Sequence, residues 1–291
     1  DASPKTAECD GLVATYKNKL TIEYAKLKEN MGTHVARKTG VEFAKGLYIL
    51  FLDPDDYLEN NALKTLHKNI QDYGKVDYIE FQYYELYRGK KHRARKLNSY
   101  KPLKKNGLVW HLDGFHAVWN KCLFAPFAKK IYEIMPSFYS IYSEDYYEMA
   151  IIQHYASSKR RLNNFLYVYT IASGVIGCKN YEKEKLKKIL ISIYNVDNHL
   201  CEFYKKYNCQ YISFIKNYTE RLYATIMERS NIQDFLSVDE ENFADDKSLQ
   251  ILLSIVHFYE RRLALLKKRA KLYEPLKFLL RPFWNFYKKI L

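Results

Sequence analysis

The fold-determining stretch is residues 30–63, NMGTHVARKTGVEFAKGLYILFLDPDDYLENNAL. Apolar residues recur at helical spacing between Val35 and Lys45, and Gly46 follows, so this pattern predicts a helix that stops there. Leu47–Leu52 is a short, continuous apolar run, which is typical of a strand covered on both faces. The stretch therefore predicts a helix, a buried strand and then an acidic segment.

The acidic segment is Asp53-Pro54-Asp55-Asp56. Its three carboxylates repel one another unless a cation lies among them, and open α/β sheets bind ligands at the carboxyl ends of their strands. One interpretation is a site for Mg²⁺ or Mn²⁺, which bind carboxylate oxygens together with substrate phosphates. The other is a β-turn that caps a helix starting at Tyr57. These four residues alone favour neither interpretation.

The whole stretch resembles the family 2 glycosyltransferases, whose common pattern is N-x-G-x-x-x-A-R-N-x-G-x-x-x-A-x-G-x-Y-(I/V)-x-F-(L/V)-D-x-D-D. The matching positions are Asn30, Gly32, Ala36, Arg37, Gly40, Ala44, Gly46, Tyr48, Ile49, Phe51, Leu52, Asp53, Asp55 and Asp56. The chain departs from the pattern at Lys38, where the family usually has Asn. The resemblance implies an α/β GT-A fold, a Rossmann-like sheet that binds a nucleotide-diphosphate sugar.

Two further segments resemble nucleotide-site elements of that family. Residues 1–6, DASPKT, are similar to D-(G/A)-S-x-D-x-T, which contacts the nucleotide base, although Lys5 replaces the acidic residue. The resemblance thus implies that Asp1 and Arg37 lie near the nucleotide. Trp119-Asn120-Lys121 resembles a W-x-K element. Trp119 is interpreted as a core residue, whereas Lys121 is left with two alternatives, a donor phosphate or a protein carboxylate.

Ser143-Glu144-Asp145 is the second candidate for chemistry. The residues by themselves describe a helix N-terminus, with Ser143 as the cap and two acidic residues that favour the helix dipole. The segment also resembles the family's E-D motif, which carries the catalytic base. An acceptor hydroxyl must lose its proton as it attacks the anomeric carbon, and a nearby carboxylate can take it. The resemblance implies Asp145 as the base and Glu144 as its neighbour.

The resemblance fades after residue 174 and implies two regions. Residues 1–175 are expected to form a GT-A domain that lacks the family's N-terminal strand-helix-strand, which would leave a sheet edge unpaired. Residues 176–291 are expected to be helical. Periodicity also predicts a helix at 61–73, a strand at 78–87 and helices at 186–200, 211–227 and 249–266, with an acidic linker at 234–246.

Composition and charge limit the alternatives. The chain has 291 residues, a formal net charge of +14 and scattered cysteines without C-x-x-C spacing, so neither a zinc site nor a disulfide framework is predicted. No apolar run is long enough for a membrane-spanning helix. A cytoplasmic location is therefore the expectation. Basic residues concentrate at Arg88–Lys96, expected to be a loop or hairpin tip, and at 260–291.

The basic segments leave two questions open. Residues 276–291 place Trp284 and several apolar residues opposite Lys277, Arg281 and Lys288, which suits either an interfacial helix on the inner face of an anionic membrane or a helix packed on the catalytic domain. Arg88–Lys96 is interpreted as a solvated face or as a contact for an anionic acceptor or lipid headgroups. Nucleic acid is not favoured as a partner, because no recognised nucleic-acid-binding motif is present.

The resemblance thus implies an inverting, metal-dependent glycosyltransferase that moves a sugar from a nucleotide-diphosphate donor, expected to be a UDP-sugar, to a glycan or lipid-linked acceptor. Asp53 and Asp55 would hold Mn²⁺ or Mg²⁺. The donor would be bound by Asp1, Arg37, Asp53 and Lys121, and Asp145 with Glu144 would serve catalysis. The alternative is a truncated, non-catalytic binding or scaffold protein of the same family, which would bind nucleotide without transfer.

Overall fold

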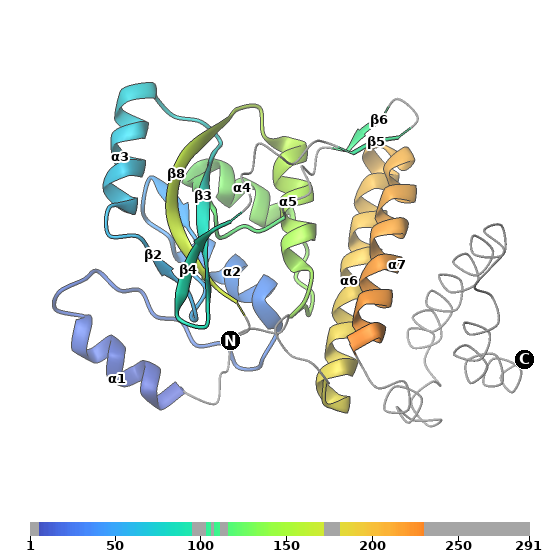
Figure 1. The fold of residues 1–291 in the computed structure, drawn as a ribbon, viewed down its shortest axis with the longest axis horizontal. Coiled ribbons are helices and arrows are strands. Elements are labelled where there is room, and N and C mark those ends of the chain that lie inside the picture. The colour runs from blue at the N-terminus through green and yellow to red at the C-terminus, as the bar shows by residue number, and fades with distance from the viewer. Residues whose placement is uncertain (1–5, 95–102, 106–107, 111–115, 172–180, 230–291) are drawn as a thin grey trace, which may run out of the picture.

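A computed structural model of the chain describes residues 6–94, 103–105, 108–110, 116–171 and 181–229. These residues form a mixed sheet with helices on both faces, followed by a helical region (Figure 1). The predicted α/β GT-A architecture with helices after it is confirmed over this range. The predicted linker at 234–246 and the helices at 249–266 and 276–291 lie outside the described residues, and the predicted division at residue 175 stays a prediction.

The main sheet has six strands in the order β1-β7-β3-β8-β2, with β4 paired to β3. β3 and β8 are parallel neighbours, and the other pairs are antiparallel. A separate two-stranded sheet pairs β5 with β6. The strands are β1 (Tyr48–Leu50), β2 (Tyr57–Leu58), β3 (Tyr78–Tyr87), β4 (Lys90–Arg93), β5 (Leu103–Lys105), β6 (Leu108–Trp110), β7 (Lys121–Phe124) and β8 (Lys159–Thr170).

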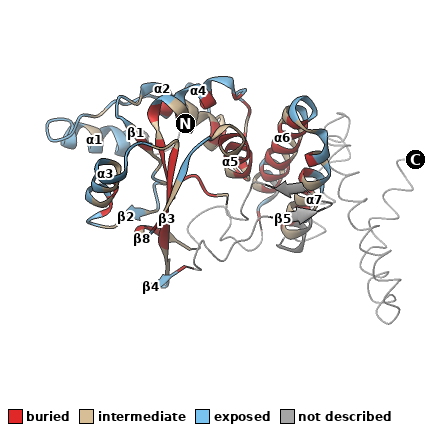
Figure 2. Ribbon diagram, turned by 90° about the horizontal axis from the view of Figure 1, so that it is seen from above, coloured by how far each residue is buried: buried red, intermediate tan, exposed pale blue. Residues whose placement is uncertain are grey.

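The two faces of the sheet are buried under different helices, because successive strand residues point to opposite sides. Tyr78 and Leu123 belong to one apolar cluster with residues of α2, α4 and α5, whereas Ile79 and Cys122 belong to a second cluster with α3. Figure 2 shows buried residues along β3, β8 and α5. The helices are α1 (Thr6–Tyr16), α2 (Gly32–Phe43), α3 (Ala62–Tyr73), α4 (Ala125–Ile134) and α5 (Glu144–Tyr155).

The helical region begins with α6 (Lys183–Tyr207) and continues through η3 (Cys209–Tyr211) to α7 (Ile212–Arg229). Val196, Leu200 and Ile215 belong to the same apolar cluster as α5, so these helices share a core with the sheet domain. The predicted helices at 186–200 and 211–227 are confirmed. Among the helices that the structure describes, none has the length and apolar character needed to cross a membrane.

The strand predicted at 47–52 is shorter and more exposed than expected. β1 covers three residues, of which Ile49 is buried, while Leu47 and Leu52 are 52% and 53% exposed. The physical reason is position, because within the described sheet β1 pairs with β7 on one side and forms an edge. The prediction from the continuous apolar run was therefore wrong about the length and the burial of this strand.

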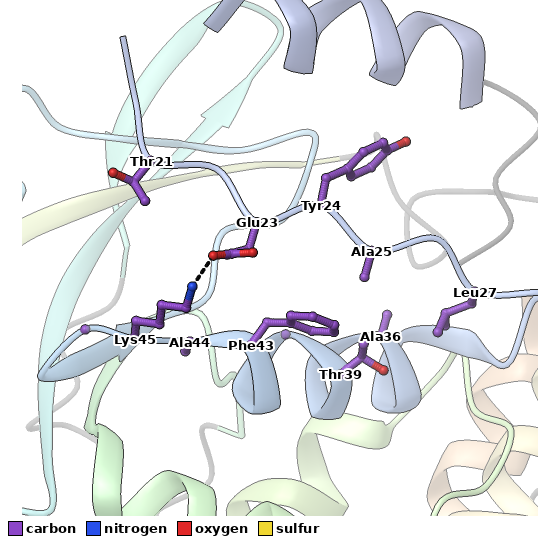
Figure 3. A pocket seen from close by; sticks show the side chains of 12 residues that line it. Thr21, Glu23, Tyr24, Ala25, Leu27, Ala36, Thr39, Phe43, Ala44 and Lys45 are labelled. Atoms are coloured by element: carbon purple, nitrogen blue, oxygen red, sulfur yellow. Dashed lines mark hydrogen bonds and ion pairs between the residues drawn. The ribbon is translucent and has the colours of Figure 1, made fainter. Parts of the chain in front are cut away.

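A pocket of about 630 Å³ lies between α2 and the extended segment 21–27 (Figure 3). Ala36, Gly40 and Phe43 line it from the helix, and Lys45 pairs with Glu23 at its rim. This face of α2 differs from the one that buries His34, Arg37 and Val41. The pocket therefore lies on another side of α2 than Arg37.

Candidate active site

The start of α2 is docked tightly beside the segment that leads into α5. Gly32 has φ +81, and a Cβ built there would lie 2.1 Å from the Ser140 carbonyl oxygen. The Thr33 amide donates to that same oxygen at 2.8 Å. Only glycine combines this φ with so close a backbone approach. This contact brings the functional face of α2 against the first turn of α5.

Arg37 of α2 lies at the centre of a buried carboxylate cluster. Its Nη1 donates to Asp145 Oδ1, to Glu148 Oε2 at 3.2 Å and to Glu144 Oε1 at 3.4 Å. Its Nη2 lies 3.6 Å from Asp53 Oδ1. The three α5 carboxylates share one helix face because residues three and four apart are neighbours. The structure therefore brings together four of the predicted site residues, Arg37, Asp53, Glu144 and Asp145.

The electrostatics of the cluster follow from burial and from the excess of carboxylates. Burial and the Asp145 charge raise the pKa of Glu144 to about 8, against the lowering effect of Arg37. Burial also raises the pKa of Asp145, against the lowering effect of Arg37. Burial lowers the pKa of Arg37, but the surrounding carboxylates hold it well above its usual value. A cationic ligand or a proton is therefore favoured here.

Ser143 does not cap α5 as the sequence predicted. Its φ of 67 places it in the left-handed region, and its side chain makes no capping hydrogen bond. The Ser143 carbonyl instead accepts from the Tyr146 amide at 3.1 Å. The first turn of α5 is thus held by tertiary packing and by Arg37, and the acidic residues there serve the cluster as well as the helix dipole.

The acidic segment forms a turn fixed to the end of β8. The Asp56 amide donates to the Asp53 carbonyl at 3.1 Å, and Tyr57 enters β2 rather than a helix. The Asp56 carboxylate accepts from the Tyr167 hydroxyl at 2.8 Å and from the Thr170 amide at 2.7 Å. Tyr167 also accepts from the Asp53 amide at 3.2 Å. The turn interpretation is therefore correct for the backbone, but the helix expected from Tyr57 is not: the next helix begins at Ala62.

The three carboxylates of the acidic turn differ in how they are placed. Asp56 is engaged by two donors from β8, whereas the Asp53 side chain is 29% exposed and Asp55 is exposed. Within the described ranges, no group of three or more His, Cys, Asp or Glu residues is placed to hold a metal ion. Asp53 and Asp55 do fit the binding habit of Mg²⁺, which uses one or two carboxylates and completes its shell with phosphates and water.

Lys121 is placed differently from the nucleotide-binding prediction. Its side chain is fully buried, and its Nζ lies 3.1 Å from Glu80 Oε1 and donates to the Ala117 carbonyl at 2.8 Å. Glu80 also accepts from Arg161 Nε at 2.5 Å. Of the two alternatives left by the sequence, the structure shows the protein carboxylate. The full burial of its ammonium group favours this structural role, and a contact of Lys121 with the donor stays a prediction.

Trp119 is a core residue, and Asp1 lies outside the described residues. Trp119 is 6% exposed and stacks on Tyr167 and Tyr169, with ring centroids 4.6 and 5.3 Å away, which agrees with its interpretation as a core residue. Its partner Tyr167 supports the acidic turn, a role that the sequence analysis did not assign. Asp1, the predicted nucleotide contact, lies outside the described residues.

The pKa of Asp56 predicts a pH dependence of stability. Burial raises it to about 6, against the lowering effect of its two donors. Because the folded-state pKa exceeds the unfolded one, this group favours the folded state most below about pH 4. We expect its contribution to the free energy of unfolding to fall as pH rises from about 4 to 6. Urea unfolding should show that the stability of the wild type relative to Asp56→Asn decreases as pH rises from about 4 to 6. A free-energy difference between the two proteins that does not change with pH would contradict the raised pKa of Asp56.

Comparison with known proteins agrees with the fold. An α/β sheet with an acidic turn after one strand and an E-D pair at a helix start is the arrangement expected of a glycosyltransferase domain. Residues 1–190 match the model of Glycosyl transferase family 2. The chain therefore belongs to this family.

Relatives share shorter segments. The poly(ribitol-phosphate) beta-N-acetylglucosaminyltransferase TarP of Staphylococcus aureus is 36% identical over 76 residues, which are 26% of this chain and 21% of TarP. The minor teichoic acid biosynthesis protein GgaB of Bacillus subtilis is 39% identical over 77 residues, which are 24% of this chain and 8% of GgaB. These alignments thus span a small part of each relative.

One solved structure shares the fold over most of the chain. It is S. aureus TarS 1-349 in complex with UDP-GlcNAc, with a TM-score of 0.53 and 18% sequence identity. The match covers 91% of this chain and 72% of that one. At this identity the likeness establishes the fold, and the ligand belongs to TarS.

Proposed function

We propose that this chain transfers a sugar from a UDP-sugar to a glycan acceptor in surface polysaccharide synthesis, with inversion at the anomeric carbon. The observation that carries the proposal is the Arg37 guanidinium, which contacts both Asp145 of α5 and Asp53 of the acidic turn. Arg37 thus connects Asp145, which is suited to take a proton, with the acidic turn at Asp53, which is suited to hold a diphosphate. Family membership supports the same reaction class.

The donor side of the site is assigned to the acidic turn. Asp53 and Asp55 would hold Mn²⁺ or Mg²⁺, which would offset the negative charge that develops on the leaving diphosphate. Asp56 and Tyr167 fix the turn against β8, so the position of Asp53 is set before a ligand arrives. Arg37, with its Nη2 near Asp53, adds positive charge beside the phosphates. Asp1 is proposed as a further contact to the nucleotide.

The acceptor side is assigned to Asp145, with Glu144 beside it. The side chain of Asp145 is 24% exposed, so it remains accessible from solvent, whereas Glu144 is more deeply buried. Asp145 would accept the proton of the attacking hydroxyl as the bond to the anomeric carbon forms. A single displacement of this kind inverts the configuration of the sugar.

The acceptor is proposed to carry negative charge. TarP is named for poly(ribitol-phosphate), and GgaB is named for minor teichoic acid biosynthesis. In this chain the β3–β4 hairpin exposes Arg88, Lys90 and Arg93, as expected for the hairpin tip predicted at that place. Such a basic edge is complementary to a phosphate-containing polymer. A peripheral position on the inner face of the cell membrane, through residues 276–291, is proposed on sequence alone.

The metal and donor assignments are tested by calorimetric titration with UDP in the presence and absence of Mn²⁺. We expect tighter binding with Mn²⁺, and we expect Asp55→Ala to weaken that binding by about tenfold or more, since a lost charged contact costs about 1.5–3 kcal/mol. Asp72→Ala, which removes an exposed carboxylate from α3, is the matched control. Unchanged Mn²⁺-dependent binding in Asp55→Ala would show the metal assignment to be wrong.

The transfer itself is tested with UDP-GlcNAc and a polyol-phosphate polymer as the first donor and acceptor. Formation of a glycosylated polymer with inverted configuration would support the proposal. Metal-enhanced UDP binding without transfer to any acceptor would instead favour the alternative of a binding protein without turnover.

A further inference from the structure

A second layer of buried polar residues lies behind Arg37. Glu148 has no exposed surface, and both of its carboxylate oxygens are engaged. Oε1 lies 2.8 Å from His34 Nδ1, while Oε2 accepts from Arg37 Nη1 at 3.2 Å and from the Tyr132 hydroxyl at 3.1 Å. The donors come from α2 and α4, so Glu148 joins three helices through one side chain.

His34 completes this layer and fixes where its protons lie. It is also fully buried, and its Nε2 lies 3.0 Å from the Pro136 carbonyl oxygen. A carbonyl accepts but never donates, so Nε2 carries a hydrogen and donates to it. Nδ1 then faces a carboxylate, and one further proton lies between Nδ1 and Oε1. His34 is thereby locked in one orientation, and it holds Glu148 in turn.

Packing alone is a poor explanation for this arrangement. Burying a carboxylate has a desolvation penalty that its partners only partly offset. A protein with an apolar group of the same volume at such a position is often as stable or more stable. Glu148 directs its second oxygen to Arg37, which also contacts Asp53, Glu144 and Asp145 of the proposed site. The buried layer therefore acts on the site through one guanidinium.

We propose that Glu148, itself held by His34 and Tyr132, is a positioning residue that orients Arg37 between the base Asp145 and the acidic turn at Asp53. This inference rests on the proposed function, because it assigns a role to the layer in the same reaction. Glu148 and His34 touch neither the donor nor the acceptor in this proposal. Their effect on transfer passes through Arg37, and the Glu148 charge also acts on Asp145 directly.

The test compares Glu148→Gln with Tyr132→Phe. In Glu148→Gln the new side-chain amide can donate to His34 Nδ1 while its oxygen accepts from Arg37 and Tyr132, so this variant keeps the hydrogen bonds. It removes the carboxylate together with the proton that lies between Nδ1 and Oε1. Tyr132→Phe removes one neutral donor and leaves the charge. We expect Glu148→Gln to lower kcat by about tenfold or more, as small displacements of positioned groups do, with the donor KM changed by less than about threefold.

The pH profile separates positioning from a merely structural role. Asp145 faces Arg37 of α2, Glu144 and Glu148 of α5, Asp53 of the acidic turn and Lys121 of β7. After burial, the Glu148 charge is among the effects that raise the pKa of Asp145. Glu148→Gln should therefore shift the acidic limb of the kcat profile to lower pH, whereas Tyr132→Phe should leave that limb in place.

A measurement that does not depend on sugar transfer distinguishes the positioning role of Glu148 from the proposed transferase function. The ¹³C shift of the Asp145 carboxyl carbon, assigned by comparison with Asp145→Asn, should titrate at lower pH in Glu148→Gln than in wild type. A shifted midpoint in a protein that transfers no sugar would support the Glu148 link and refute the proposed function. Normal transfer with wild-type kcat and an unshifted midpoint in Glu148→Gln would refute the positioning inference.

Discussion

Replacing Asp145 by Asn is expected to lower kcat by about 10²–10⁴-fold, the usual contribution of a general base. Asn keeps the size of the side chain, and its carbonyl can still accept from Arg37 Nη1, but it has no charge with which to take a proton. The donor side should be preserved, because Asp53, Asp55 and the turn that holds them are untouched. Initial-rate kinetics and UDP calorimetry on the same preparation measure both effects.

Asp72→Asn serves as the control for this variant, since it makes the same chemical change on the exposed face of α3. We expect it to leave both kcat and UDP binding within about twofold of wild type, as surface substitutions do. Transfer at a wild-type rate in Asp145→Asn would move the base to another residue. Glu144 would then be the first to test, because it contacts the same guanidinium nitrogen.

Replacing Lys121 by Met should destabilise the fold by about 3–5 kcal/mol, the usual cost of removing one partner from a buried ion pair. Lys121 has no exposed surface, and its loss leaves Glu80 buried beside the partly exposed Arg161. The free energy of unfolding in urea measures the change. Lys121→Met/Glu80→Gln should recover part of the loss, because no carboxylate charge is then left buried.

Lys91→Met is the matched control, because it removes a lysine from an ion pair with Glu59 that lies on the surface. Exposed pairs of this kind contribute about 0–1 kcal/mol. A much larger loss of stability in Lys121→Met than in Lys91→Met would support the buried ion pair between Lys121 and Glu80. A small loss of stability in Lys121→Met, together with weaker UDP binding, would support the nucleotide-binding prediction for this lysine.

The site shows where prediction from sequence stops. Glu144 and Glu148 are four apart in E-D-Y-Y-E, so their shared helix face was readable in principle from spacing. Nothing in that spacing indicates that His34, 114 residues away, would lie within hydrogen-bond distance of Glu148. The same holds for Asp56, whose two donors come from β8. Local patterns report which backbone a segment favours, and they carry no distances between segments.

The sequence by itself determined the family, the α/β class, the helix at 61–73, the strand at 78–87, and the two acidic segments that carry the proposed chemistry. These features depend on local periodicity and on a motif of residues close together in the chain. Only the tertiary structure decided that β1 is an edge strand, that Lys121 pairs with Glu80, and that Asp56 supports the turn. Each of these depends on how distant segments pack, because burial and charge pairing are set by neighbours in space.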